Sequence, residues 1–220
     1  MAELILEEHS VQRIDKPAGI TSFGVVARVR RRLSEKLGKK AKVGHTGTLD
    51  PFATGLMLIV TGKECRNAMQ YSKLDKEYEA TFVLGKTSTT GDPEGEITEV
   101  DGAVPSEDEI CSALQQFTGE IKQRPPIYSA IKINGRRAYD LARKGESIEM
   151  PERTVTVYAL ELLEYTYPEL KVRAHVSSGT YIRTLAEDVG VTLGTAAYCS
   201  QLRRTKVGEW SVEEAYTIEA

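Results

Sequence analysis

The spacing of apolar residues switches along the chain between the two-residue period of strands and the period of about 3.6 residues of helices. Residues 76–85 alternate as a strand does, and residues 153–179 offer two or three further strands joined by a turn. Apolar residues at helical spacing mark residues 23–37, 106–118 and 180–194 as helices. Because strands and helices do not alternate as regular βαβ units, the sequence predicts an α+β fold rather than a doubly wound sheet.

Short polar residues and glycines mark the ends of the expected helices. Thr21 or Ser22 follows a Pro-Ala-Gly break and is a suitable N-cap for the first helix. Ser106, with a glutamate three residues later, has the pattern of a capping box at the start of the second helix. We expect Thr180 to cap the third helix and Gly194 to end it.

Length and composition restrict the class of protein. With 220 residues, of which 40% are hydrophobic and 28% charged, the chain can bury a core as one large domain or two small ones. No apolar run approaches the roughly 18 residues of a membrane span, and the acidic N-terminus is unlike a signal peptide. Cys65, Cys111 and Cys199 are far apart, and neither Cys nor His residues have metal-ligand spacing. We therefore expect a soluble, cytoplasmic protein without a metal.

The net charge of −3 conceals a segregation of basic and acidic residues. Residues 28–42 contain eight Lys or Arg and one Glu, and residues 122–144 contain seven Lys or Arg and one Asp. A third, small cluster consists of Arg203, Arg204 and Lys206. Each basic run alone is compatible with an ordinary solvated helix face, but the three together favour binding of a phosphate backbone.

One carboxylate, Asp50, lies in the glycine-rich stretch "GHTGTLDPFATG" between a basic run and the apolar run "LMLIV". An Asp-Pro pair among glycines is typical of a tight turn in which the carboxylate accepts local N–H groups. The surroundings also fit a site, because Gly44 and Gly47 would let a ligand backbone approach and His45 adds a hydrogen-bonding group. The apolar run that follows would hold the loop rigidly.

Two further stretches contain residues able to do chemistry. In "SSGTYIRTL", Tyr181 and Arg183 stand at the start of a helix directly after a strand. They fit a packed ring and a surface ion pair, or a guanidinium that fixes a carboxylate in a site. In "DKEYEATF", Tyr78 at the start of a strand is compatible with a simple core residue.

Six stretches, in order along the chain, resemble the TruB family of tRNA pseudouridine synthases, which modify the uridine at position 55 in the T arm. They are "IDKPAGITSF", "KVGHTGTLDPFATGLMLI", "KEYEATFVLG", "QRPPIYSAIKINGRRAYDLARKG", "SSGTYIRTLAEDVG" and "LRRTKVG", spanning roughly residues 12–208. The resemblance implies the pseudouridine synthase fold, with a central mixed, mostly antiparallel sheet flanked by helices and loops. It also implies one catalytic domain over residues 1–220, with a basic thumb-like insertion at about residues 120–150. Longer members of the family carry a further C-terminal domain of the PUA type, and in this respect we expect the chain to depart from them, with no separate domain of that type.

The resemblance assigns roles to the residues of the three stretches. Asp50 aligns with the essential aspartate, and Arg183 with the arginine that forms an ion pair with it. Tyr78 aligns with the tyrosine that stacks on the target base and helps to move its C5 proton. Tyr181 matches a further active-site tyrosine, and Leu202 an apolar residue that lines the base pocket.

The resemblance also implies contacts around this centre. His45 matches a histidine that assists extrusion of the base from the RNA, and Lys16 and Pro17 match a motif that supports the site structurally. The insertion would close over the RNA loop with four basic residues near phosphates. These are Arg124, Lys132, Arg136 and Arg137.

The implied reaction detaches uracil from C1′ of the ribose and reattaches it through C5, which needs no cofactor. Asp50 would either attack C1′ or remove a C2′ proton to give a glycal, and the resemblance favours the glycal. A paired-carboxylate hydrolase of nucleosides is disfavoured, because no second acid stands in a comparable motif. A non-catalytic RNA-binding or tRNA-folding module on the same scaffold is the alternative. We expect a monomer that acts on the T arm of tRNA without a membrane or a protein partner.

Overall fold

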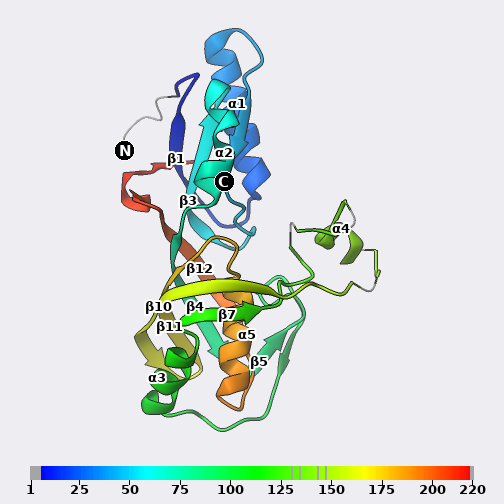
Figure 1. The fold of residues 1–220 in the computed structure, drawn as a ribbon, viewed down its shortest axis with the longest axis vertical. Helices are drawn as coiled ribbons and strands as arrows, with labels where there is room; N and C mark the ends of the chain where they lie inside the picture. The colour runs from blue at the N-terminus through cyan, green and yellow to red at the C-terminus, as the bar shows by residue number, and fades with distance from the viewer. Residues whose placement is uncertain (1–5, 130, 134, 143, 147, 219–220) are drawn as a thin grey trace. The chain divides into compact units, whose positions relative to one another are not determined.

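The computed structural model describes residues 6–129, 131–133, 135–142, 144–146 and 148–218 (Figure 1). The chain forms two compact units, the first from Met1–Tyr78 and Leu202–Ala220 and the second from Glu79–Gln201. Strands β4 (Lys76–Leu84) and β12 (Ala197–Val207) each contribute residues to both units. The single catalytic domain expected from the sequence stays a prediction.

The first unit contains a mixed sheet built around β3 (Thr54–Thr61). The antiparallel partners of β3 are β1 (Val11–Lys16) and β2 (Val43–His45), and its parallel partner is β12. The remaining short strands are β13 (Trp210–Ser211), antiparallel to β12, and β14 (Tyr216–Thr217), parallel to β1. Every residue of β3 after Thr54 is buried, which explains why its sequence reads as a continuous apolar run.

The first predicted helix is confirmed as α1 (Ser22–Leu37). Thr21 is its N-cap, with the side-chain oxygen accepting from the N–H of Gly24 at 3.0 Å. The helix ends at Gly38, whose φ of 63° is the left-handed conformation that suits glycine. Its buried face carries Val25, Val26, Val29 and Leu33, so the basic residues of the run 28–42 are left largely toward solvent. The short helices η1 (Gly62–Arg66) and α2 (Ala68–Ser72) follow β3.

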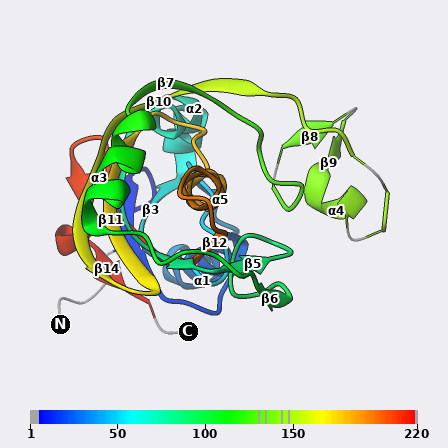
Figure 2. The same cartoon turned by 90° about the horizontal axis from the view of Figure 1, so that it is seen from below.

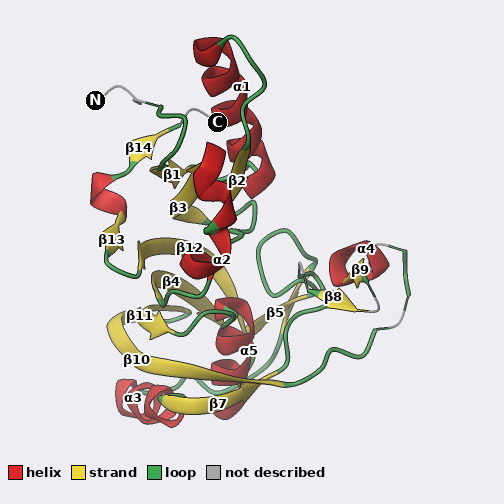
Figure 3. Ribbon diagram, turned by 45° about the horizontal axis from the view of Figure 1, so that its top comes forward, coloured by secondary structure: helices red, strands yellow, loops and turns green. Residues whose placement is uncertain are grey.

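The second unit contains an antiparallel arrangement in which β10 (Arg153–Thr166) pairs with both β11 (Glu169–Val176) and β7 (Gly119–Gln123). The β10–β11 hairpin turns at Tyr167–Pro168, as the sequence predicts. Two helices accompany these strands, α3 (Glu107–Gln116) and α5 (Ile182–Thr192) (Figure 2). A small ribbon of β5 (Lys86–Ser88) and β6 (Ile97–Glu99) also belongs to this unit. The α+β prediction, with a mixed and mostly antiparallel sheet, is confirmed (Figure 3).

The predicted helix ends of this unit are partly confirmed. Ser106 and Glu109 form the capping box of α3. Gly194, with φ of 68°, follows the end of α5 as expected. The N-cap of α5 is Tyr181, so the prediction of Thr180 is wrong, because the Thr180 hydroxyl instead donates to the Ser177 carbonyl at 3.0 Å.

Between β7 and β10 lies an insertion, residues 124–152. It contains β8 (Lys132–Ile133), β9 (Arg136–Arg137) and α4 (Ala138–Ala142). The two strands form a tight hairpin in which Gly135 has φ of 81°, as expected of an Asn-Gly turn, although Asn134 lies outside the described residues. Figures 1 and 2 show α4 well apart from α3 and α5 of the same unit. Among the residues that the structure describes, no helix has both the length and the apolar character to cross a bilayer.

Candidate active site

Asp50 is half-buried in the loop that joins β2 to β3. Leu49, the residue before Asp50, is held by Ser22, whose hydroxyl donates to the Leu49 carbonyl and accepts from the Leu49 N–H, both at 2.8 Å. On the other side, the Asp50 carbonyl accepts from the N–H of Ala53 at 3.1 Å. The backbone is thus fixed immediately before and after Asp50, as a preorganised site requires.

Lys16 fastens a second segment to this loop. Its side chain is fully buried, and its ammonium donates to the backbone carbonyls of Pro17 (2.9 Å), Ile20 (2.8 Å) and Pro51 (3.1 Å). The Pro51 carbonyl also accepts from the N–H of Gly19 at 2.9 Å. Burying an ammonium is tolerated only when its donors are satisfied, so these carbonyls and Lys16 stabilise one another. The residue after Asp50 is therefore held to the turn that follows β1.

Arg204 holds the loop from β12. It is 2% exposed, and its guanidinium donates to the carbonyls of Leu56 (2.7 Å), Gly47 (3.2 Å) and Thr48 (3.5 Å). A Cβ on Gly47 would lie 3.4 Å from Nη1 of Arg204, and one on Gly55, which has φ of 106°, would lie 2.3 Å from the Arg204 carbonyl oxygen. Gly55 is therefore the glycine that allows the backbone at Arg204 to approach this segment so closely. A Cβ on Gly44 would make only an ordinary contact, 3.7 Å from Val60.

The small basic cluster near residue 204 differs from the sequence interpretation. Arg203 pairs with Asp15 through two hydrogen bonds of 2.8 and 3.1 Å, and Lys206 lies 3.4 Å from Glu77. Successive residues of a strand point to opposite faces, which places Arg204 in the interior and Arg203 on the outer side. The expectation that Arg204 contributes to phosphate binding is wrong, because its guanidinium is buried against backbone carbonyls.

Tyr78 lies on β4, where its ring is 8% exposed. Lys76, two residues earlier on the same face of the strand, is also buried. Burial, assisted by the positive charge of Arg204, lowers the pKa of Lys76 to about 8. The Lys76 ammonium donates to the carbonyls of Ser72 and Leu74, which compensate part of its burial. His45, the last residue of β2, is half-buried in this unit, and Leu202 of β12 is buried.

Arg183 lies in the first turn of α5 and is 3% exposed. Its guanidinium donates to the carbonyls of Thr90 (2.7 Å) and Tyr128 (2.8 Å) and forms an ion pair with Asp92 at 3.1 Å. The ion pair with Asp50, implied by the resemblance, would join residues of different units and stays a prediction. Tyr181, half-buried, precedes this turn.

Asp92, which belongs to the turn-rich stretch "TTGDPEG", was not predicted from the sequence as a site residue. Its Oδ2 faces Arg183, while Oδ1 accepts from the Thr90 hydroxyl at 2.6 Å and from the Glu94 N–H at 3.0 Å. Gly91 has φ of 72°, a left-handed conformation that other residues rarely adopt, so this turn favours glycine at that position. The available signal was a glycine before an acid, which also fits any solvated turn.

Glu187 lies one helical turn after Arg183. Burial raises the pKa of Glu187, and the negative charges of Asp188 and Asp92 act in the same direction, while Arg183 opposes them. The Arg183–Asp92 pair therefore lies in surroundings that carry further negative charge.

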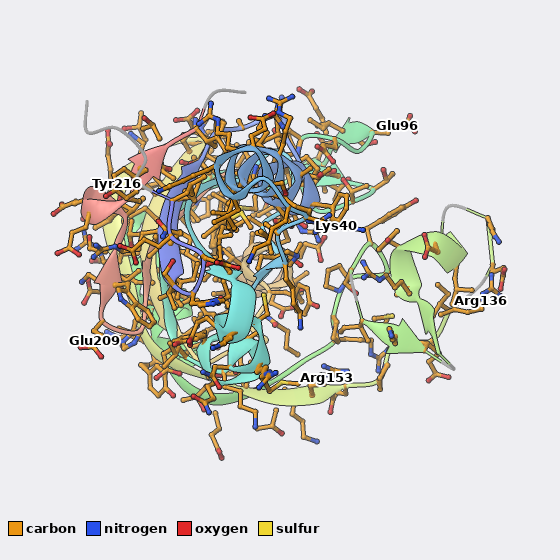
Figure 4. The ribbon with its side chains drawn as sticks, turned by 90° about the horizontal axis from the view of Figure 1, so that it is seen from above. Lys40, Glu96, Arg136, Arg153, Glu209 and Tyr216 are labelled. Carbon is orange, nitrogen blue, oxygen red and sulfur yellow. The ribbon has the colours of Figure 1, made fainter. Side chains whose placement is uncertain are left out.

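The insertion carries the basic residues expected to meet phosphates. Arg124, Lys132, Arg136 and Arg137 are all exposed. Arg136 projects from the insertion (Figure 4) and forms a double hydrogen bond with Glu146, at 2.8 and 3.2 Å. Arg137 stacks over the ring of Tyr139, with its guanidinium carbon 5.8 Å from the ring centre. A cavity of about 570 Å³ is lined by Lys132, Gly135, Arg136, Arg137, Asp140 and Lys144.

Comparison with known proteins identifies relatives along most of the chain. Residues 31–182 match the family described as "TruB family pseudouridylate synthase (N terminal domain)". A protein of Phocaeicola vulgatus named tRNA pseudouridine synthase B is 46% identical over 219 residues, which cover 97% of this chain and 92% of that protein. The protein of the same name from Parabacteroides distasonis is 45% identical, over 90% of this chain and 86% of that protein. The one from Burkholderia mallei is 42% identical, over 94% of this chain and 67% of that protein.

Solved structures share the fold. A chain of the Cbf5–Nop10–Gar1 complex has a TM-score of 0.71 at 33% identity, covering 96% of this chain and 53% of its own length. A chain of an H/ACA RNP bound to a substrate RNA containing 2′-deoxyuridine gives 0.69 at 31% identity, with 96% and 51% covered. This chain thus spans about half the length of those solved chains. Since the family match covers most of the chain and the named relatives are more than 40% identical over at least 90% of it, this chain belongs to the TruB family of pseudouridylate synthases.

Proposed function

We propose that this chain is a tRNA pseudouridine synthase that isomerises the uridine at position 55 in the T loop of tRNA. The observation that carries the proposal is the fixed backbone on both sides of Asp50. Three buried side chains, Lys16, Ser22 and Arg204, hold this loop from three different elements. Such rigidity has a physical reason if Asp50 must meet one atom of a ribose in one geometry.

The reaction needs one carboxylate. The N1–C1′ bond of uridine breaks, a C5–C1′ bond forms, the proton leaves C5 and N1 gains one, so the product is an isomer. The uracil anion leaves without a strong acid, whereas a paired-carboxylate glycosidase requires a second acid at a defined distance. Asp50 either attacks C1′ or removes the C2′ proton to give a glycal, and we favour the glycal by resemblance to the family.

Tyr78, Leu202 and Tyr181 are proposed to receive the target base. Extruding a base costs a few kcal/mol, and an aromatic ring that stacks on it returns about 1–3 kcal/mol. The buried Tyr78 ring suits that role, with Leu202 lining the pocket and His45 assisting extrusion. Tyr78 would also help to move the C5 proton after the base has turned.

Arg183 is proposed to fix the Asp50 carboxylate. Its guanidinium is oriented by Thr90, Asp92 and Tyr128, so it would meet Asp50 without losing side-chain freedom at that moment. A guanidinium has five donors in a planar fork, enough to serve these partners and a second carboxylate.

The insertion is proposed to bind phosphates of the T loop. A shaped, single-stranded RNA loop is the kind of target that proteins read specifically. The basic cavity at Lys132, Arg136 and Arg137 gives the phosphates a concave, positively charged surface, and the exposed Arg124, directly after β7, adds a further positive charge. We propose that the chain acts as a cytoplasmic monomer without a protein partner.

The test uses an unmodified T-arm stem-loop with tritium at C5 of the target uridine. Release of tritium, with the nucleoside mass unchanged in the product, is the expected result. Free uracil in the product would identify a nucleoside hydrolase. RNA binding without tritium release would identify an RNA-binding module, because the exposed basic residues of the insertion can bind RNA without Asp50. Either of the last two results overturns the proposal.

A further inference from the structure

Gln123 uses both polar groups of its side chain on one distant residue. It is the last residue of β7 and is 2% exposed. Its Oε1 accepts from the N–H of Tyr181 at 2.8 Å, and its Nε2 donates to the Tyr181 carbonyl at 3.0 Å. A buried amide that binds one residue through both its oxygen and its nitrogen favours one position for that residue.

Tyr181 is the residue at which α5 starts. It is the N-cap, with extended φ and ψ of −104° and 111°, and its carbonyl accepts the first helical hydrogen bond from the Leu185 N–H at 3.1 Å. In a capping box, a glutamate or glutamine of the helix itself binds the N–H of the N-cap residue. Here the third helical residue is Thr184, and Gln123 performs this role from a different element.

The same helical turn is joined to the insertion at a second point. Arg183 donates to the carbonyl of Tyr128 at 2.8 Å. The segment that begins the insertion, residues 124–128, therefore lies between two attachments to the start of α5, at Gln123 and at Tyr128. Movement of this segment would be transmitted to the turn that carries Arg183.

We propose that Gln123 is a positioning residue, whose amide holds Tyr181, and through the first turn of α5 also Arg183, in the geometry that the reaction requires. The same contact fastens the root of the insertion to that turn. This inference rests on the proposed function, because the reaction assigns Tyr181 and Arg183 to the site. Misplacement of a reacting group by about 1 Å can reduce a rate by about 10²-fold, so a loss of tens-fold in kcat is expected without the amide.

Two substitutions separate hydrogen bonding from packing. Gln123→Met keeps the side-chain volume and removes both hydrogen bonds at every pH. Gln123→Glu is an isostere that, when protonated, both accepts from the Tyr181 N–H and donates to the Tyr181 carbonyl, but is only an acceptor when ionised. The control is Gln115→Met on the exposed face of α3.

The expected signature is a pH-dependent rescue. Relative to the wild type, kcat of Gln123→Glu should fall by about tenfold as the pH rises from about 6 to 8.5, because burial raises a carboxyl pKa and ionisation then breaks the clamp. The charged groups near this position are Arg153, opposite it on β10, Arg124 and Arg183, whose positive charges act on the substituted carboxyl in the direction opposite to burial. They shift the midpoint of the transition and do not create it.

Single-turnover tritium release and RNA affinity are measured for all four proteins, together with amide hydrogen exchange of the peptide that contains Tyr181. The proposal predicts a tens-fold lower kcat for Gln123→Met at all pH values, RNA affinity within a few-fold, and faster exchange at Tyr181 without loss of protection elsewhere. Wild-type kcat in Gln123→Met, or Gln123→Glu and Gln123→Met with the same pH profile, would overturn it. Unchanged exchange at Tyr181 in Gln123→Met would do so too, independently of any activity. Absence of tritium release from the wild type would instead defeat the proposed function.

Discussion

Replacing Arg204 by methionine tests whether the loop around Asp50 is held from β12. The substitution removes the donors to Leu56 and Gly47, whose hydrogen bonds measure 2.7 and 3.2 Å, and a weaker contact to Thr48 at 3.5 Å. Hydrogen bonds from a charged donor contribute about 1.5–3 kcal/mol each, so the two better ones amount to about 3–6 kcal/mol. Part of this is offset because a buried guanidinium no longer has to be desolvated. We expect the free energy of unfolding to fall by about 3 kcal/mol.

The matched control is Arg203→Met, one residue away on the other face of the same strand. Its pair with Asp15 is partly exposed, and such pairs contribute about 0–1 kcal/mol. Urea unfolding measures both free energies, and for a chain of this length about 1 kcal/mol corresponds to about 2–4 °C in Tm. At temperatures where both variants are folded, kcat should fall in Arg204→Met and remain near wild type in Arg203→Met. Equal stability and equal kcat in the two variants would refute the reasoning.

Three further predictions concern charged residues. Asp92→Asn leaves the buried charge of Arg183 without its ion-pair partner, so we expect a loss of about 3 kcal/mol in urea unfolding and a lower kcat at unchanged RNA affinity; wild-type values for both would contradict this. The pKa of Lys76 is about 8 when folded and 10.5 in its ordinary state, so the unfolded chain binds the extra proton between these values and stability increases with pH there. Relative to Lys76→Met, the free energy of unfolding of the wild type should increase by about 1–2 kcal/mol from pH 7.5 to 9.5. The same dependence of stability on pH in both proteins would contradict this prediction. Replacing Arg136 and Arg137 by alanine should weaken RNA binding and reduce the slope of log K against log salt by about 1–2, with kcat at saturation within a few-fold; an unchanged slope would count against phosphate contacts there.

Local signals allowed the helices and turns to be predicted from the sequence. Thr21 and Ser106 cap their helices as expected, since a capping hydrogen bond depends only on residues two or three positions apart. The prediction of Thr180 as the N-cap of α5 is wrong because the contact that fixes this N-cap comes from a distant part of the sequence. The partner of the N-cap of α5 is Gln123, 58 residues before Tyr181, and no local pattern reveals it.

The candidate site shows the same division. Asp50, Tyr78 and Arg183 were assigned to the site through the family resemblance of the motifs that contain them, and Lys16 was predicted in the same way to support it. The contact of Arg204 with the Asp50 loop was not predicted, because the burial of a cation depends on which face of a strand meets the loop. A cluster of basic residues in a sequence suggests a surface. Because successive residues of a strand point to opposite faces, however, Arg204 points into the interior while Arg203 does not. Gly55 likewise allows one segment of the protein to approach another, because a Cβ there would lie 2.3 Å from the Arg204 carbonyl oxygen.

The measurement that tests the central claim most directly is single-turnover conversion of the T-arm stem-loop by Asp50→Asn with the protein in excess. Asparagine is nearly isosteric with aspartate and removes only the charge and the basic oxygen pair, so the loop and the RNA-binding surface should persist. The account predicts no detectable pseudouridine from this variant, with RNA affinity within a few-fold of the wild type. Conversion by Asp50→Asn at a rate near that of the wild type would contradict it.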